Sequence, residues 1–343
     1  MIITLNNIVK EFKVLNRREG LKGSIKDLFS RDYKIVKAVD DISLEIEAGE
    51  ILGYIGPNGA GKSTTIKMMT GVLKPTSGEI LVNGRVPYEN RTKNAQNIGV
   101  VFGQRTQLWW ALPLIESFKI LKDMYQVNDK DYQEMIALYE SLVDLKKLYS
   151  KPVRQMSLGQ RTLSDILASF LHNPSVVFLD EPTIGLDVSM KSKIRELITA
   201  LNKEKNTTVI LTTHDMGDID ALCKRTIIID KGKKLYDDST GNLKSLFGSY
   251  RTLKLTFFEA KEHELENIAT DINLKLHEKF ENMEIQATHN EEWIDVLMKE
   301  DETSTMEVLN FIQKQYKIND IKLEDISTEN VVKKIYEREK IIK

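Results

Sequence analysis

The 343-residue sequence is poor in several features that would restrict its class. It contains one cysteine, Cys223, so an internal disulfide is excluded and a reducing compartment is expected. No apolar run approaches the roughly 20 residues of a membrane-spanning helix. The opening residues Met1–Asn7 lack the basic region and apolar core of a secretion signal, so we expect none. The net charge of −2 gives no general basis for binding nucleic acid, and none is expected.

A glycine-rich stretch supplies the strongest motif. Gly56-Pro57-Asn58-Gly59-Ala60-Gly61-Lys62-Ser63-Thr64 fits the phosphate-binding pattern G-x-x-x-x-G-K-S/T. The apolar run before it, Ile51–Ile55, predicts a buried strand, and good helix formers follow it. The glycines allow backbone N–H groups to wrap around phosphates. Lys62 is expected to reach the β- and γ-phosphates and Ser63 to ligate magnesium. A chance glycine turn is the weaker alternative in this context.

A second apolar run ends in two carboxylates. Val176–Leu179 predicts a strand, followed directly by Asp180 and Glu181. Asp180 can hold magnesium, directly or through water, since magnesium prefers oxygen ligands. Glu181 can orient and deprotonate an attacking water. Two solvated acids are the alternative, which the upstream phosphate motif disfavours.

Three further residues gain meaning only together. Gln104, after the predicted strand 98–102, could contact magnesium or the lytic water. Ser157 precedes a helical run, where it could help a second helix N-terminus bind phosphate or serve as an ordinary N-cap. His214, at the end of the predicted strand 207–213, could bond a γ-phosphate or be structural.

Alternating buried strands and helices predict an α/β domain with a largely parallel sheet over residues 1–245. A mainly helical block is expected within it at about 105–172. A small α+β domain without a recognisable motif is expected at 246–343. Its expected elements are strands at 251–258 and 292–298 and helices near 259–270, 303–316 and 328–340.

Two segments near the start carry open interpretations. Residues 2–15 read as a strand pair around the polar turn Asn6-Asn7. The basic stretch 17–31 predicts either a solvated surface insertion or a short amphipathic helix at a membrane interface or membrane partner.

In the order of these motifs, the chain resembles the ATP-binding-cassette ATPases, which are the nucleotide-binding subunits of ABC transporters. The resemblance covers roughly residues 1–240. The matching segments are the Walker A motif at 56–64, the Q-loop at Gln104, the signature at Met156–Gln160, Walker B at Val176–Asp180, the catalytic Glu181, the D-loop at Gly185–Asp187 and the switch His214. The resemblance implies a P-loop NTPase fold: a RecA-like core, an antiparallel β subdomain and an inserted helical subdomain. It also implies ATP and Mg²⁺ as cofactors, with Tyr33 stacking on adenine and Gln104 among the magnesium ligands.

In that family the signature of one subunit completes the ATP site of another. The resemblance therefore implies a head-to-tail dimer, with a homodimer favoured. The residues expected to act across its interface are Ser157, Gly159, Gln160 and Asp187. It also implies a membrane permease in separate chains and a peripheral location at the cytoplasmic face of the plasma membrane. A soluble ABC ATPase of translation or DNA repair is an alternative. Another is a regulatory ligand sensor in the C-terminal domain.

The signature departs from the family pattern because Leu158 replaces its first glycine. Its Ser-Leu-Gly-Gln-Arg variant and the run Leu108–Pro113 resemble a branch of drug and antibiotic exporter ATPases. The insertion at 17–31 is similar instead to polysaccharide and teichoic-acid exporter ATPases. Trp109 and Trp110 are expected either to pack against the helical block or to dock the permease.

Overall fold

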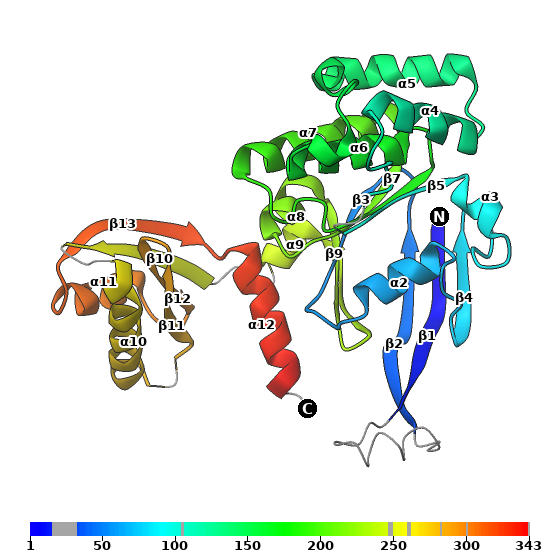
Figure 1. Cartoon of the computed structure of the whole chain (residues 1–343). Helices are drawn as coiled ribbons and strands as arrows, with labels where there is room; N and C mark the ends of the chain where they lie inside the picture. Colours follow the sequence, from blue (N-terminus) through cyan, green and yellow to red (C-terminus); the bar gives the residue numbers. More distant parts are fainter. Residues whose placement is uncertain are drawn as a thin grey trace, which may run out of the picture. The chain divides into compact units, whose positions relative to one another are not determined.

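The computed structural model shows two compact units, Met1–Thr240 and Gly241–Lys343 (Figure 1). We describe each unit by itself. The described residues are 1–15, 33–103, 106–245, 250–258, 262–281, 283–299 and 301–341. The insertion at 17–31 and Gln104 lie outside them, so both stay predictions.

A six-stranded sheet forms the centre of the first unit. Its order is β5-β6-β7-β3-β8-β9, in which β9 alone runs antiparallel to its neighbour. The strands are β3 (Ile51–Ile55), β5 (Ile98–Phe102), β6 (Val176–Asp180), β7 (Thr208–Thr212), β8 (Arg225–Asp230) and β9 (Lys233–Ser239). All residues of β3 and β7 are buried, which explains why these strands are continuous apolar runs. The carboxyl ends of β3, β6 and β7 lead directly into the residues of the candidate site.

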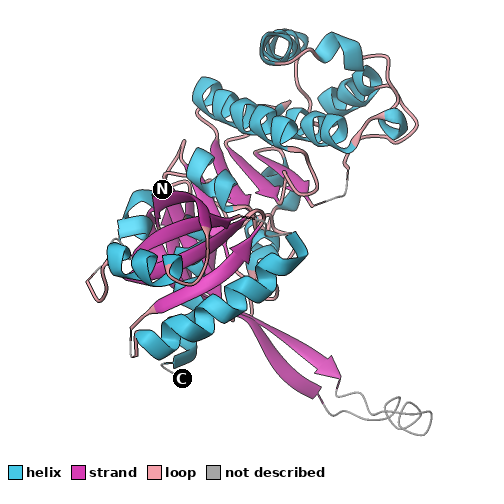
Figure 2. Cartoon of the chain, turned by 90° about the vertical axis from the view of Figure 1, so that its left-hand side faces the viewer, coloured by secondary structure: helices cyan, strands magenta, loops and turns pink. Residues whose placement is uncertain are grey.

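Helices lie on both sides of this sheet (Figures 1 and 2). They are α2 (Lys62–Met69), α3 (Arg91–Ala95), α6 (Leu158–Phe170), α7 (Val188–Lys205) and α8 (Met216–Leu222). Ile66, Met68 and Met69 of α2 join the buried core together with residues of the sheet. The phosphate loop is therefore held between a buried strand and a helix that is anchored by its apolar side.

A three-stranded antiparallel sheet, ordered β2-β1-β4, completes the core of this unit. Its strands are β1 (Ile3–Leu15), β2 (Tyr33–Ile46) and β4 (Ser77–Val82). The expected strand pair in 2–15 is wrong: one strand continues through Asn7, whose φ is 47°, with a shift in register between Leu5 and Ile8. A local irregularity therefore replaces the turn.

The helical block contains α4 (Leu114–Met124), α5 (Asp129–Leu142) and α6, joined by two 3₁₀ helices, η1 (Leu145–Leu148) and η2 (Val153–Gln155). Tyr139 of α5 is fully buried, and its hydroxyl donates to the carbonyl of Leu167 on α6 at 2.6 Å. Its ring meets Phe118 of α4 edge-on, with centroids 6.3 Å apart. This contact fixes the signature helix within the block. Among the described helices, none has the length and apolarity needed to cross a membrane.

The second unit begins with α9 (Thr240–Ser245), which continues from the last residue of the first unit, and then has the order β-α-β-β-α-β followed by a helix. The later elements are β10 (Tyr250–Phe257), α10 (Glu262–Lys279), β11 (Ile285–Asn290), β12 (Trp293–Lys299), α11 (Thr305–Gln313), β13 (Ile318–Asp325) and α12 (Thr328–Ile341). Its antiparallel sheet has the order β11-β12-β10-β13. Residues of α10 and α11 form one buried cluster with the sheet. Strands β11 and β13 were not predicted, and the helix predicted at 259–270 continues to Lys279.

Candidate active site

The phosphate loop is shaped by close backbone packing. Gly61 has a φ of 108°, and a Cβ there would lie 2.4 Å from the carbonyl oxygen of Ala38 in β2. A Cβ on Gly56 would lie 2.4 Å from the carbonyl oxygen of Ile229 in β8. Only glycine fits either position, because a side chain would displace neighbouring backbone. The loop therefore rests against β2 and β8.

Lys62 is turned into this loop. The residue is 7% exposed, and its Nζ donates to the carbonyl oxygens of Gly56 at 2.5 Å and Pro57 at 3.1 Å. Burial lowers the pKa of Lys62, although the nearby carboxylates of Glu181 and Asp180 oppose that shift. No side chain caps the N-terminus of α2, which begins here. A cation and an uncapped helix N-terminus thus lie together, an arrangement suited to an anion.

The two carboxylates meet the end of β7. The hydroxyl of Thr212 donates to Oδ1 of Asp180 at 2.5 Å, and the N–H of Glu181 donates to the carbonyl of Thr212 at 2.9 Å. Glu181 itself has a positive φ of 54°, and Nε2 of His214 lies 2.6 Å from its Oε1. The structure therefore brings Asp180, Glu181 and His214 together, with Lys62 close to both carboxylates, and the roles of these residues stay predictions.

A buried acid that the sequence analysis missed supports this arrangement. Asp218 is fully buried and accepts hydrogen bonds from the hydroxyls of Thr183 and Thr213, which follow β6 and β7. Arg195 of α7 neutralises it, with Nη2 2.6 Å from Oδ1. One carboxylate thus fixes the loops that carry Glu181 and His214. Its sequence gave no recognisable signal, since the charge pattern of a short helix looks ordinary.

The signature residues lie at the N-terminus of α6. Ser157 caps the helix by accepting from the N–H of Gln160 at 3.2 Å, and Oε1 of Gln160 accepts from the N–H of Ser157 at 3.2 Å. Lys151 also donates to that Oε1 at 2.8 Å. The N-cap alternative is therefore what this structure shows. The phosphate-binding role of Ser157 and Gln160 stays a prediction.

Two glycines bring the signature against its neighbours. A Cβ on Gly159 would lie 2.5 Å from Cγ of Met190 in α7, so glycine permits this close approach of the two helices. A Cβ on Gly185 would lie 3.3 Å from Cδ2 of Leu158, so the leucine side chain rests beside the D-loop. Asp187 caps α7 by accepting from the N–H of Met190 at 2.9 Å.

The segment after Gln104 is tied to α6. Oδ1 of Asp165 accepts from the Thr106 hydroxyl at 2.8 Å and from the Gln107 N–H at 3.1 Å. Burial raises the pKa of Asp165 to about 6. One turn earlier, the Arg161 guanidinium lies 4.7 Å from the ring centre of Trp110, which is 51% exposed. Trp110 thus packs on the helical block and still presents surface, so both interpretations of this tryptophan remain open.

The adenine-stacking aromatic has a second candidate besides Tyr33. The loop touches β2 at Ala38, and Tyr33 lies five residues away, about 17 Å along an extended strand. Phe12 of β1 pairs with Val36 of β2, and Val36 lies only two residues, about 7 Å, from Ala38 along the strand. The Phe12 side chain is 37% exposed. The sequence contained this signal, an aromatic in the first strand, but only the register of β1 on β2 reveals it. Tyr33 stays a prediction, and Phe12 is the better placed of the two.

Oxygen ligands suited to magnesium flank the loop. Ser63 is exposed in the first turn of α2, and the carboxylate of Asp180 is oriented by Thr212. A hydroxyl and a carboxylate are the donors that this ion prefers beside a phosphate group. The donor set therefore fits Mg²⁺.

A glycine-rich loop between a parallel strand and a helix, with a lysine and two strand-end carboxylates, defines a P-loop ATPase. Comparison with known proteins narrows this class. The family model described as "ABC transporter" matches residues 39–184. The ABC transporter ATP-binding protein NatA of Bacillus subtilis is 33% identical over 229 residues, covering 67% of this chain and 92% of NatA. The linearmycin resistance ATP-binding protein LnrL of the same organism is 32% identical over 265 residues, covering 76% and 85%.

Solved structures of ATP-binding cassettes have the same fold as this chain. A dimeric ATP-binding cassette bound to ADP and phosphate matches with a TM-score of 0.55 and 25% identity, covering 69% of this chain and 98% of that one. The ATP-binding subunit of an ABC transporter matches in fold with a TM-score of 0.59 and 21% identity, covering 72% and 94%. The chain belongs to the ABC transporter ATP-binding proteins, and it is an ATP-binding ATPase subunit with the expected cassette fold.

Proposed function

We propose that two copies of this chain form a head-to-tail dimer around two ATP molecules with Mg²⁺ and power export through a separate permease. The similarity to LnrL, named for linearmycin resistance, supports a drug, antibiotic or other amphiphile as the exported substrate. The subunit would then work at the cytoplasmic face of the plasma membrane. The observation that carries the dimer is the position of Ser157, which is exposed and whose hydrogen bonds run to Gln160.

In this proposal Lys62 leaves the carbonyls of Gly56 and Pro57 to contact the β- and γ-phosphates. Ser63, Asp180 and Gln104 would hold magnesium, which when bound would supply charge neutralisation at the phosphates. Glu181 orients the attacking water and takes its proton. His214, whose Nε2 lies 2.6 Å from Oε1 of Glu181, holds that carboxylate before ATP binds and then donates instead toward the γ-phosphate. Phe12 provides the stacking surface for adenine.

Binding energy then drives closure. ATP on one subunit is contacted by Ser157, Gly159 and Gln160 of the other, with Asp187 also at the interface. Because the γ-phosphate bridges both halves, its loss permits them to separate. Each hydrolysis cycle would thus move the helical block, to which the permease is expected to dock.

Glu181→Gln tests this mechanism. The amide keeps the size of the side chain but cannot accept the proton, so we expect turnover to fall roughly 10²–10⁴-fold while ATP binding is retained. ATP should then trap a dimer detectable by gel filtration. The matched control is Glu196→Gln on the exposed side of α7, which should behave like the parent. Parental turnover in Glu181→Gln would refute the assignment of the base.

The transporter role needs a separate experiment. We expect the chain to co-purify from membranes with a polytopic permease, identified by mass spectrometry. Recovery only with ribosomes or DNA would instead support a translation or repair ATPase.

A further inference from the structure

The sheet of the second unit has two edges that differ in how they are protected. At β11, the N–H of Ala287 donates to Oδ1 of Asn273 on α10 at 2.9 Å, so a helix covers that edge. At β13, the N–H of Ile321 donates to Oδ1 of its own neighbour Asp320 at 2.8 Å. The N–H of Ile321 is therefore not used in the hydrogen bonds to β10, and it faces away from the sheet. An edge strand with outward backbone groups is a template for another strand.

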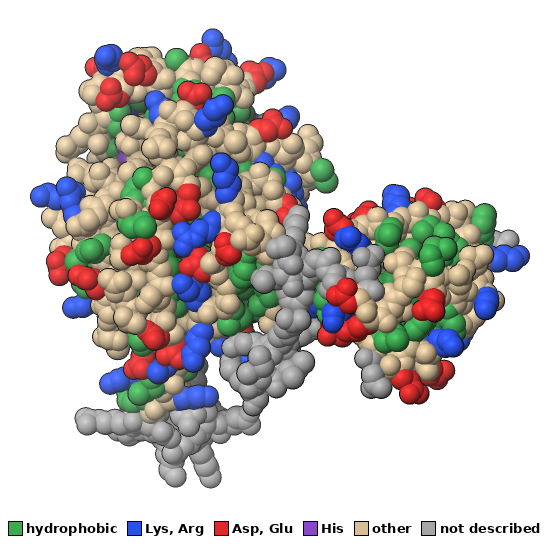
Figure 3. Space-filling model, turned by 180° about the vertical axis from the view of Figure 1, so that it is seen from behind, with side chains coloured by type: hydrophobic (Ala, Val, Ile, Leu, Met, Phe, Trp, Pro, Cys, Tyr) green, Lys and Arg blue, Asp and Glu red, His purple; other side chains and the backbone are tan. Residues whose placement is uncertain are grey.

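Apolar side chains follow the same edge. Ile321 is 43% exposed and Leu323 is 52% exposed, although their partners on β10, Leu255 and Leu253, are buried in the core. Cross-strand partners share a face, so the core face continues past the helices and ends uncovered at β13. A groove of about 620 Å³ runs beside Ile321 and includes Phe258, which is 59% exposed. Hydrophobic side chains gather on this unit in Figure 3.

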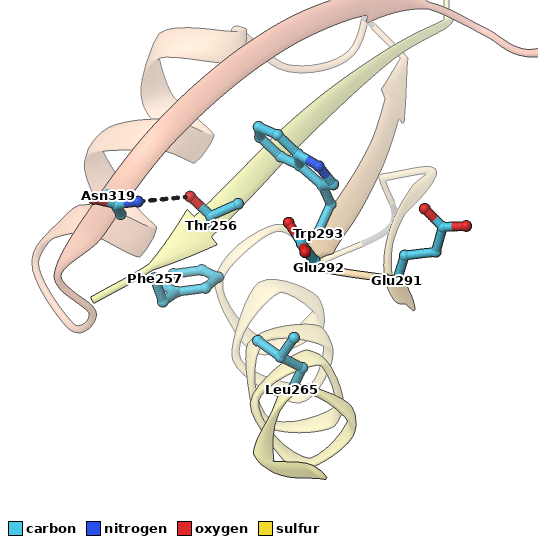
Figure 4. Close-up of a pocket in the computed structure, with 7 residues that line it drawn as sticks. All are labelled: Thr256, Phe257, Leu265, Glu291, Glu292, Trp293 and Asn319. Carbon is cyan, nitrogen blue, oxygen red and sulfur yellow. Dashed lines mark hydrogen bonds between the residues drawn. The ribbon is translucent and has the colours of Figure 1, made fainter. Parts of the chain in front are cut away.

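The opposite face of β13 carries charges. Lys322 lies with Nζ 4.4 Å from the ring centre of Trp293, so it extends over the sheet and not across the edge. Glu324 is paired with Lys254 at 3.3 Å. Within the described part of the chain, Asp320 has no ion pair. Figure 4 shows Asn319, at the start of this strand, bonded to Thr256 of β10 at 3.4 Å, and Trp293 nearby. The strand is thus held on one side and open on the other.

We propose that β13 pairs antiparallel with β13 of a second copy about a two-fold axis, which joins two four-stranded sheets into one. The symmetric register that we infer places Ile321 opposite Ile321 of the second copy. This register sets Asp320 of each copy opposite Lys322 of the other, twice, and Lys322 must leave the ring of Trp293 to form these pairs. It also buries the exposed isoleucine and gives the outward N–H of Ile321 a carbonyl partner across the axis.

Other symmetric registers are less favourable. Centring the pair on Lys322 would place two ammonium groups opposite each other and Asp320 opposite Glu324. Centring it on Leu323 would place Lys322 opposite Glu324, which Lys254 already holds, and Ile321 opposite Asp325, which Arg251 holds. Like charges directly opposite disfavour the Lys322-centred register. The Leu323-centred register would make Lys322 compete with Lys254 for Glu324 and would set the paired Asp325 opposite an isoleucine, so the Ile321-centred register is the more favourable one.

Charge swaps on the full chain test this register. In nucleotide-free buffer with a chelator, sedimentation velocity over micromolar concentrations should show a monomer–dimer equilibrium. Asp320→Lys and Lys322→Asp should each raise the dimer Kd on the order of tenfold or more, because each creates two like-charge pairs. The double variant should restore the parental Kd. Gln286→Lys, on the covered edge strand β11, is the matched control and should leave Kd unchanged.

A monomer at all these concentrations, parental Kd in both single variants, or no rescue in the double variant would each overturn the proposal. The dimer proposed for ATP binding requires nucleotide, whereas this one does not. An ATP-trapped Glu181→Gln dimer without a nucleotide-free dimer would therefore refute only the β13 interface. The reverse result would refute only the ATP-bridged one.

Discussion

The N-termini of α2 and α6 are both suited to phosphate by their position, but they differ in how their N–H groups are satisfied. At α2 no side chain caps the helix, and the nearby cation, Lys62, is held by the loop's own carbonyls. At α6 a reciprocal capping box between Ser157 and Gln160 occupies the same kind of groups. The first is thus preformed for an anion, whereas the second must open its cap to receive one. In the proposed dimer, this difference lets ATP bind one subunit before the two close.

The largest effect should come from the backbone at the open helix. Gly61→Ala places a Cβ 2.4 Å from the carbonyl oxygen of Ala38 at a φ of 108°, so we expect ATP binding to weaken on the order of a hundredfold or more. Gly59→Ala is the control. Its φ is 82°, but no atom lies within 4 Å of its Cβ, so we expect the free energy of ATP binding to weaken by only about 1 kcal/mol. Titration with a fluorescent ATP analogue measures both. Equal losses would show that steric contact with β2 is unimportant.

Lys62→Ala tests the charge at the same helix. Loss of a charged hydrogen-bond donor to phosphate costs about 1.5–3 kcal/mol, so ATP affinity should fall roughly 10- to 150-fold. Lys67→Ala, on the exposed side of α2, should bind ATP as the parent does. Calorimetric titration gives the dissociation constants. Unchanged affinity in Lys62→Ala would exclude the proposed contact.

A buried histidine just after α6 predicts that folding stability depends on pH. His172 follows this helix, stacks on Tyr125 at 3.9 Å, and has Nε2 3.0 Å from the carbonyl of Ile98. Burial lowers the pKa of His172 to about 4. The unfolded histidine takes up its proton near pH 6.5, whereas the folded one does so only near pH 4. The neutral buried ring therefore contributes to folding stability above pH 6.5, and about 3 kcal/mol of that contribution is lost as the pH falls toward 4.

Urea unfolding followed by circular dichroism at several pH values between 7 and 4.5 measures this loss. His172→Gln should reduce the pH dependence of stability, whereas His277→Gln, on the exposed side of α10, should keep it. An unchanged slope in His172→Gln would assign the acid sensitivity to other groups.

The smallest effect is expected at the capped helix itself. Ser157→Ala removes one contact to phosphate at each of the two sites of the dimer, worth about 1 kcal/mol apiece, so the ATP-trapped dimer of Glu181→Gln should weaken about 30-fold. Binding of ATP to the monomer should not change, which separates this variant from Lys62→Ala. Ser141→Ala on α5 serves as the control. If Ser157→Ala weakens monomer binding instead, the two helix ends act within one subunit.

The order of the motifs predicted the cassette fold, and Asp180, Glu181 and His214 were chosen as candidates because each lies at or just after the end of an apolar strand. Periodicity locates such strands, and parallel topology then brings their ends together. Asp218 was not predicted, since its role depends on Thr183 and Thr213 converging from different loops.

Edges and irregular strands were harder to predict. β13 has no fully buried residue, and its alternation of apolar and charged side chains is confined to residues 320–324, so the strand was not predicted. The shift at Asn7 looks like a turn because asparagine favours positive φ in both settings. Phe12 depends on the register between β1 and β2, which local sequence does not encode.

The positive φ of Glu181, 54°, is a conformation in which most side chains cost about 1–2 kcal/mol and glycine costs little. Selection for folding stability alone would therefore favour Glu181→Gly. Such a variant should unfold at a higher urea concentration while losing the carboxylate that His214 contacts at 2.6 Å. In the proposed mechanism this position thus gives up folding stability for catalysis, and a stabilising substitution there would abolish activity.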